Sequence, residues 1–282
     1  MTPPNTLSIL ERSNVTISGA SGPNAPAIVF LHGLGGDQND WRLVAPAFEE
    51  KYQVILLDLI GAGNSDLSAY NHKTHGTLNG HASDLLDVLS ALALHDIVFV
   101  GHSVAAMIGV IAAVREPQRF AKMVLVSPSP RFINEKGYAG GFEQKDINEL
   151  LAAMEADYNG WSHGFAPVMM GQNESPELVM ELTNSFVRTN PEIVKHFARV
   201  TFFSDTRAEL GFLTIPTLIV QSAHDVIAPL AVGHYINEQL ADSRIAIIET
   251  GGHCPHLSAP QKTIGAIDNF LHHETLLAQG LN

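Results

Sequence analysis

A single serine lies between two apolar segments, in an arrangement that presents a nucleophile. The segment before it, Asp96-Ile-Val-Phe-Val-Gly101, is short and β-branched, as expected of a strand buried on both faces of a parallel sheet. The segment after it, residues 105–114, favours a helix. A tight turn between them needs small residues two positions before and after the serine, and Gly101 and Ala105 supply them. Alanine replaces the glycine that commonly ends this Gly-x-Ser-x-Gly pattern, and Ser103 is the predicted nucleophile.

The hydroxyl of serine is a weak nucleophile at neutral pH, so the chemistry also needs a base and a carboxylate that orients the base. Asp225 comes a few residues after the apolar run 217–221, and His253 comes after the run 244–249. Serine, carboxylate and then histidine is one known chain order of a catalytic triad. We predict that His253 takes the proton of Ser103 during attack, while Asp225 holds the tautomer and stabilises the imidazolium.

Other residues compete for these roles, because the chain has 14 histidines. His256 is the closest rival of His253, and we interpret it as a structural or pocket residue. Asp58 follows a strand-like run but precedes the serine, so we expect it to stabilise its loop. His102 adjoins the serine and should point away from its hydroxyl, packing and hydrogen bonding behind the turn. Cys254 is interpreted as a packed thiol, with a redox-sensitive thiol as the alternative.

The developing oxyanion needs N–H donors. The Val104 amide, at the start of the predicted helix, is one candidate, and the Leu34 amide in the loop after the run 27–31 is the other. Glycines 33, 35 and 36 would let this loop approach a substrate closely. The loop lacks both the Lys-Ser/Thr of a nucleotide-binding P-loop and the Gly-x-Gly-x-x-Gly spacing, and no metal-ligand spacing is convincing. We predict catalysis without a cofactor and without a metal.

Strand-like runs alternate with helical stretches along most of the chain. This order predicts an α/β fold with a mostly parallel central sheet covered by helices on both faces. Ligands bind beyond the carboxyl ends of such strands, where the polar and glycine-rich segments of this chain fall. The strand-like runs are residues 15–18, 27–31, 53–57, 97–100, 123–126, 217–221 and 244–249.

The alternation stops between about residues 131 and 213, where amphipathic helical stretches occur with no convincing strand. We predict an α/β core formed by residues 1–130 and 214–282, with a helical cap inserted at 131–213. Residues 143–158 and 177–188 carry helical periodicity. Most aromatic residues of the insertion should form its own core. Some should line an inner surface over the serine, which would select hydrophobic small molecules.

Composition excludes several classes of function. With 282 residues, 45% of them hydrophobic, the chain can bury a large core. A formal net charge of −13 with only 16 Lys and Arg residues argues against nucleic acid as a partner. No apolar run approaches the ~20 residues of a membrane span, and residues 1–11 do not resemble a signal peptide. One cysteine suits a reducing compartment, so we expect a cytoplasmic protein without a membrane partner.

Five segments of the chain resemble a specific branch of the α/β-hydrolases. That branch holds the bacterial RsbQ-type hydrolases of sigma-B stress signalling and the plant strigolactone and karrikin receptors. The resemblance runs from about Asn14 to Leu271. The segments are His32-Gly-Leu-Gly-Gly-Asp-Gln-Asn-Asp-Trp41, Gly101-His-Ser-Val-Ala-Ala-Met-Ile-Gly109, Ser127-Pro-Ser-Pro-Arg-Phe132, Gly140-Gly-Phe-Glu-Gln144 and Gly252-His-Cys-Pro-His-Leu257.

The resemblance implies specific roles for residues of this chain. It implies a triad of Ser103, Asp225 and His253, with the amides of Leu34 and Val104 as oxyanion donors. It also implies a V-shaped cap of four helices over a hydrophobic pocket. Leu34 replaces the phenylalanine usual in these relatives, and Ala105 replaces serine or glycine, so the ligand is less transferable than the mechanism. The implied pocket wall includes Phe132, Phe142, Trp161 and Phe165.

Three functional hypotheses follow. The first is a hydrolase of small hydrophobic esters or lactones that acts through an acyl-enzyme on Ser103. The second is a ligand sensor with a regulatory protein partner and slow or incidental hydrolysis, as in an RsbQ-like stress regulator. The third is haloalkane or epoxide opening, which serine at position 103 disfavours because that chemistry uses an aspartate nucleophile at the same turn.

Overall fold

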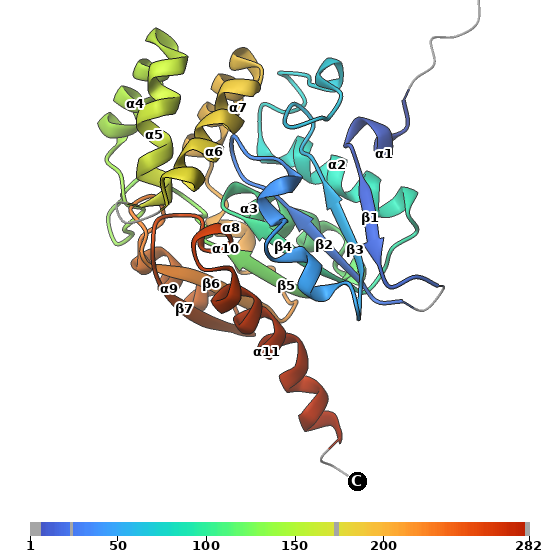
Figure 1. Cartoon of the computed structure of the whole chain (residues 1–282). Coiled ribbons are helices and arrows are strands. Elements are labelled where there is room, and N and C mark those ends of the chain that lie inside the picture. Colours follow the sequence, from blue (N-terminus) through green and yellow to red (C-terminus); the bar gives the residue numbers. More distant parts are fainter. Residues whose placement is uncertain (1–6, 23–24, 172–174, 280–282) are drawn as a thin grey trace, which may run out of the picture.

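The protein folds around one twisted sheet of seven strands in the order β1-β3-β2-β4-β5-β6-β7 (Figure 1). The computed structural model describes residues 7–22, 25–171 and 175–279. Only β1 is antiparallel to its neighbour, so the predicted mostly parallel sheet is confirmed. The strands are β1 (Thr16–Gly19), β2 (Ala27–Leu31), β3 (Gln53–Leu57), β4 (Ile97–His102), β5 (Phe120–Val126), β6 (Thr217–His224) and β7 (Ser243–Gly251).

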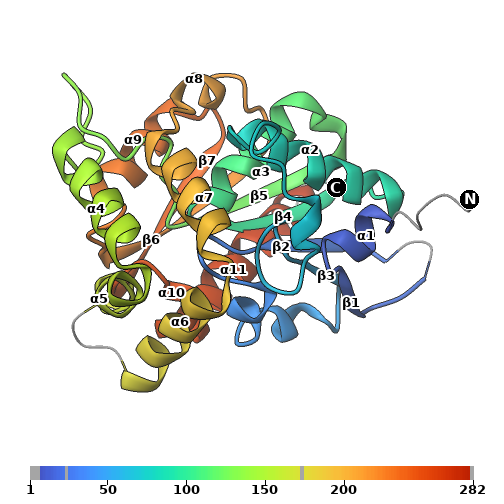
Figure 2. The same cartoon turned by 90° about the horizontal axis from the view of Figure 1, so that it is seen from above.

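Helices cover both faces of this sheet (Figure 2). Val29 and Leu31 of β2 share a hydrophobic cluster with α2 and α3, whereas Ile28 and Phe30 face a second cluster with Phe270 of α11. This alternation follows from the period of two in a strand. The α-helices other than the four of the cap are α1 (Ile9–Arg12), α2 (Leu78–Ala91), α3 (Val104–Arg115), α8 (Arg207–Leu210), α9 (Leu230–Gln239), α10 (Pro255–Ser258) and α11 (Pro260–Gln279).

Four helices form the predicted cap between β5 and β6, and they stand together at one end of the sheet in Figure 1. They are α4 (Gln144–Ala156), α5 (Tyr158–Met170), α6 (Pro176–Arg188) and α7 (Pro191–Phe203). The prediction of one helical stretch over residues 143–158 is wrong at its end. Asp157 has an extended backbone and its carboxylate accepts a hydrogen bond from the Gly160 amide at 2.9 Å, so it starts α5 as an N-cap.

The strands extend beyond their predicted apolar runs. β4 continues to His102, β6 to His224 and β7 to Gly251, because pairing with neighbouring strands extends into polar and glycine residues. His224 pairs with Gly251, so the ends of β6 and β7 meet at the same edge of the sheet. Asp225 therefore follows its strand directly. Within the residues described, no helix has the length and apolar character needed to cross a bilayer.

Gly109 lies where α3 packs directly on β4. A Cβ at this position would lie 2.1 Å from Cε1 of Phe99, whose ring is fully buried and cannot move aside. We expect Gly109→Ala to lower the free energy of unfolding by about 1–3 kcal/mol, measured by urea denaturation. Gly164→Ala on the exposed side of α5 is the control, because its Cβ would meet nothing within 4 Å. The free energy of unfolding of this control should rise by about 0.5–1 kcal/mol, because alanine favours a helix over glycine. Equal effects of the two substitutions would contradict this packing.

Candidate active site

Ser103 stands at the turn between β4 and α3 in a backbone conformation that a residue with a side chain rarely adopts. Its φ is +56° and its ψ is −124°. The turn is close-packed: a Cβ on Gly101 would lie 2.7 Å from the Phe99 ring and 2.9 Å from the backbone of Ala105. The Ser103 amide donates to the Val126 carbonyl of β5 at 2.8 Å, which fixes the turn at the carboxyl edge of the sheet. Packing therefore requires glycine at position 101.

The three predicted triad residues form one chain of hydrogen bonds. His253 Nε2 lies 2.7 Å from Ser103 Oγ, and His253 Nδ1 lies 2.7 Å from Asp225 Oδ2. The second carboxylate oxygen of Asp225 accepts from the amides of Ile227 at 2.8 Å and Ala228 at 3.0 Å. The side chains of His253 and Asp225 are 1% and 0% exposed. Ser103 and Asp225 are 122 positions apart in the sequence, and Asp225 and His253 are 28 positions apart. The fold brings the three together as one buried array.

The backbone of His253 is held at both of its polar groups. Its amide donates to the Met169 carbonyl of α5 at 2.6 Å, and its carbonyl lies 2.8 Å from His102 Nε2. The preceding Gly252 has φ +78°, and a Cβ there would lie 2.1 Å from the Met170 carbonyl oxygen. The loop can therefore reach this position only with glycine at 252. The predicted hydrogen-bonding role of His102 is confirmed, although sequence reasoning did not identify its partner.

The rival histidines are packed and neutral. His256 is fully buried, with its ring centroid 4.4 Å from that of His102 and 4.6 Å from that of Trp41. Burial lowers the pKa of His256 to about 3, and burial also holds the pKa of His102 well below its usual range. Within the described chain neither ring nitrogen of His256 has a hydrogen-bond partner. His256 therefore acts as a packing residue, in agreement with the sequence.

Asp58 and Cys254, the other two residues considered for the site, are both buried in the fold. Asp58 is fully buried and accepts hydrogen bonds at 2.8 Å from the Asn14 side chain and from the amides of Gln38 and Asn64. It ties three segments of loop together, which is the stabilising role predicted for it. Cys254 is 2% exposed, so its thiol lies away from solvent.

The loop after β2 lies directly against the serine turn. A Cβ on Gly33 would lie 3.2 Å from the Cβ of Ser103 and 2.9 Å from His102 Nδ1. Two residues later, the Gly35 carbonyl accepts a hydrogen bond from Ser185 of α6 at 2.7 Å. Leu34 therefore lies between the turn and the cap. In the described structure neither the Leu34 amide nor the Val104 amide donates to a backbone acceptor.

The four aromatic residues expected at the pocket wall belong to one cluster of rings, in which Phe132, Trp161 and Phe165 are buried and Phe142 is partly exposed. Trp161 and Phe165 of α5 stack with centroids 4.7 Å apart. Phe202 of α7 contacts Phe132 at 5.2 Å, Phe142 at 6.4 Å and Phe165 at 6.5 Å between centroids. The cluster therefore joins the cap helices to the segment that follows β5. The rings pack against one another, in agreement with the prediction that most aromatic residues of the insertion form its own core.

A cavity of about 1300 Å³ lies between α5, α6 and the ends of β6 and β7. It borders the loops that carry the histidine and aspartate of the array, through His224 and Gly252, but Ser103 does not line it. Sequence reasoning missed this cavity because its walls come from distant segments with no shared motif. The lining includes Pro167, Val168, Val179, Met180, Thr183 and Val226.

Burial of His256 makes the stability of the fold dependent on pH. The pKa of His256 is about 3 in the folded protein and has its ordinary value of 6.5 in the unfolded chain. Between these two pH values the unfolded chain binds one more proton than the folded protein, so the free energy of unfolding falls as the pH falls. We expect His256→Gln to flatten the pH dependence of the free energy of unfolding by about 1.4 kcal/mol per pH unit between about pH 4 and 6. Urea denaturation at a series of pH values measures it. The exposed His163→Gln should leave the slope unchanged; an unchanged slope for His256→Gln would refute this assignment.

Comparison with known proteins agrees with this geometry. A family model described as the alpha/beta hydrolase fold matches residues 26–260. A strigolactone esterase of Arabidopsis thaliana is 40% identical over 254 residues, covering 89% of this chain and 93% of the relative. A Karrikin insensitive 2 receptor of Petunia hybrida is 35% identical over 265 residues, covering 94% of this chain and 97% of the relative.

A solved structure gives the same result. The structure of a hydrolase from Oleispira antarctica matches with a TM-score of 0.90 at 37% identity, covering 94% of this chain and 96% of that chain. The similarity to RsbQ-type hydrolases stays a prediction. Because the family model and these relatives extend over most of the sequence, this chain belongs to the α/β-hydrolase family, in the branch of the strigolactone esterases and karrikin receptors.

Proposed function

We propose that this protein hydrolyses carboxylic esters or lactones of small hydrophobic molecules through an acyl-enzyme on Ser103. The observation that carries the proposal is the continuous hydrogen-bonded array from Ser103 Oγ through the His253 ring to Asp225, with 2.7 Å at each step. A hydroxyl in this array is hydrogen-bonded to a base whose tautomer is fixed by the carboxylate. The esterases among the relatives support the same class of reaction.

The reaction follows from the positions of these atoms. As Ser103 Oγ attacks the carbonyl carbon, its proton passes to His253 Nε2. When the tetrahedral intermediate collapses, the imidazolium returns that proton to the leaving alkoxide, and the acyl group stays on the serine. A water molecule then attacks the acyl-enzyme with His253 again as the base. With a lactone, the leaving alkoxide stays tethered to the acyl group, so the ring opens before hydrolysis.

The amides of Leu34 and Val104 form the oxyanion hole in this proposal. Val104 is the first residue of α3, where amide groups point out of the helix without intrahelical partners. The loop after β2 lies so near the serine turn that a Cβ added to Gly33 would lie 3.2 Å from the Ser103 Cβ. Neither amide donates to a backbone acceptor among the described residues, so both are available to a negative oxygen.

Apolar surroundings define the substrate class in this proposal. The ring cluster that includes Phe132, Phe142, Trp161 and Phe165 offers apolar surface in the insertion above the sheet, and these rings would contact the acyl or alkyl part of a substrate. Residues 131–213 act as the cap unit over the core of residues 1–130 and 214–282. The net charge of −13 disfavours strongly anionic substrates. A 3-oxoadipate enol-lactonase among the relatives supports the inclusion of lactones.

The receptors among the relatives support a second candidate function. A Karrikin insensitive 2 receptor is 35% identical to this chain across 94% of its length. In this alternative the protein is a ligand sensor with a regulatory protein partner, and hydrolysis is slow or incidental. The same array then serves mainly to hold a ligand in the closed site.

Removal of the nucleophile tests the first proposal. We expect Ser103→Ala to lower the turnover of p-nitrophenyl acetate by at least about a thousandfold, and His253→Ala to cause a similar loss, because the array acts as a unit. His95→Gln, an exposed change in the loop before β4, should retain the wild-type rate. Equal rates for the wild type and Ser103→Ala would defeat the proposal.

The time course of the same assay separates the two candidates. An esterase should release p-nitrophenol steadily over many turnovers. A sensor should release a burst of about one equivalent and then turn over very slowly, since the acyl-enzyme persists.

A methyl group on Gly33 tests the oxyanion hole. Its Cβ would lie 2.9 Å from His102 Nδ1 and 3.2 Å from the Ser103 Cβ, so the loop must move and carry the Leu34 amide with it. We expect Gly33→Ala to lower kcat by about a hundredfold or more with a small change in KM. Gly164→Ala, which meets no neighbouring atom, is the matched control. A wild-type kcat for Gly33→Ala would remove this loop from the mechanism.

A further inference from the structure

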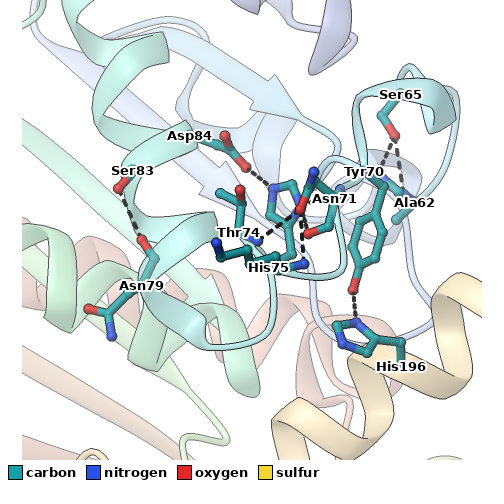
Figure 3. A network of polar contacts seen from close by, with 12 residues as sticks. Ala62, Ser65, Tyr70, Asn71, Thr74, His75, Asn79, Ser83, Asp84 and His196 are labelled. Atoms are coloured by element: carbon teal, nitrogen blue, oxygen red, sulfur yellow. Dashed lines mark hydrogen bonds and ion pairs between the residues drawn. The ribbon is translucent and has the colours of Figure 1, made fainter.

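A group of metal-ligating side chains lies outside the triad, beside α2. His75, in the turn before this helix, lies with its Nε2 2.9 Å from Asp84 Oδ2 (Figure 3). His81 packs against His75 with ring centroids 4.7 Å apart. One ligand atom from each of these three residues lies within 4.8 Å of the others. Across the described ranges, no second group of three such side chains is this close.

His81 is the unexplained member of this group. His81 is 1% exposed, and neither of its ring nitrogens has a hydrogen-bond partner within the described chain. Buried polar groups nearly always have a partner, so an imidazole without one points to a ligand. His256 is also buried without a partner, but it belongs to no such group of three. Proximity to a second imidazole and a carboxylate therefore distinguishes His81.

We propose that His75, His81 and Asp84 bind a divalent transition-metal ion of the zinc type. Two imidazole nitrogens and one carboxylate oxygen form a donor set that zinc accepts, with water in the fourth position. His81 and Asp84 are three residues apart on α2, so both project from the same face of this helix. No metal-ligand spacing is convincing in the sequence, because His75 comes from the preceding turn and only the fold brings it to this face of α2.

The surroundings of the three residues fit a metal site. His75 Nδ1 accepts a hydrogen bond from the Asn71 amide at 2.9 Å, so without a metal the ring proton is on Nε2 and is donated to Asp84. Binding of an ion through Nε2 moves this proton to Nδ1, where the Asn71 carbonyl oxygen, 3.1 Å away, accepts it. The Asp84 side chain is 21% exposed, which gives an ion access from solvent. In tetrahedral zinc sites the ligand atoms lie about 3.3 Å apart, so binding draws the His81 ring toward the other two.

The site lies at the contact between the core and the cap. The His81 ring lies 4.6 Å from that of Phe197 on α7, and Tyr70 stacks on His75 at 4.7 Å between centroids. The Tyr70 hydroxyl is 2.7 Å from His196 Nδ1 on the same cap helix, as Figure 3 shows. An ion held by His75 and His81 would stabilise the surface on which α7 rests. Its role is structural, because none of its ligands belongs to the catalytic array.

Cobalt titration of the chelator-stripped full-length chain tests the proposal, because Co²⁺ occupies zinc sites and absorbs visible light. We expect one Co²⁺ per chain with the strong d–d bands of a four-coordinate site, displaced by Zn²⁺. Zn²⁺ should also raise the thermal unfolding midpoint of the stripped chain. Asp84→Asn and His81→Gln should each weaken Co²⁺ binding by at least about tenfold.

Two controls make the result specific. His72→Gln changes a neighbouring histidine outside the group, and His163→Gln changes an exposed histidine on α5; both should bind Co²⁺ as the wild type does. The far-ultraviolet circular dichroism of each variant reports whether it folds, and Asp84→Asn keeps the shape of its partly exposed side chain. No four-coordinate spectrum in the wild type, or equal binding in Asp84→Asn and the wild type, would overturn the proposal.

Discussion

The position of the His253 imidazole is the constraint on which the site depends. Its ring bonds to Ser103 on one side and to Asp225 on the other, and its backbone bonds to the cap through Met169 and to the serine turn through His102. These contacts join β4, the ends of β6 and β7, and α5 at one point. A small shift of any of them would lengthen a 2.7 Å hydrogen bond, and proton transfer is sensitive to that distance. The strained backbone conformation of Ser103 costs about 1–3 kcal/mol. It persists because the surrounding packing and hydrogen bonds hold it in place.

Burial gives this array its chemical character. Ser103 is 5% exposed and His253 is 1% exposed, so charges that develop there are poorly screened by water. In such surroundings fixed amide dipoles stabilise an oxyanion more strongly than solvent would. The same burial keeps the neighbouring His102 and His256 neutral, so no second imidazolium opposes protonation of the base. The packed aromatic rings of the insertion extend this apolar environment into the cap.

Local sequence patterns predicted the features that depend on neighbouring residues in the sequence, namely the central strands and the serine turn. Continuous β-branched runs identified the central strands, since burial on both faces requires them, and the small residues around Ser103 identified the turn. Long-range contacts were not predictable in the same way. The bond from His102 to the His253 carbonyl spans 151 positions, and the break between α4 and α5 depends on one capping carboxylate within a continuous helical pattern. Likewise, the aromatic residues of the insertion predicted a core within the cap, but not which rings contact one another. His75 joins His81 and Asp84 only through the turn that precedes α2.

The central claim is that the array makes one hydroxyl reactive, and covalent labelling tests it without knowledge of the natural substrate. The measurement is the rate of modification by a fluorophosphonate, followed by intact mass and peptide mapping. The account predicts a single adduct on Ser103 that forms rapidly in the wild type, far more slowly in His253→Ala and not at all in Ser103→Ala. Modification at the same rate in the wild type and in His253→Ala, or no modification of the folded wild type, would contradict it.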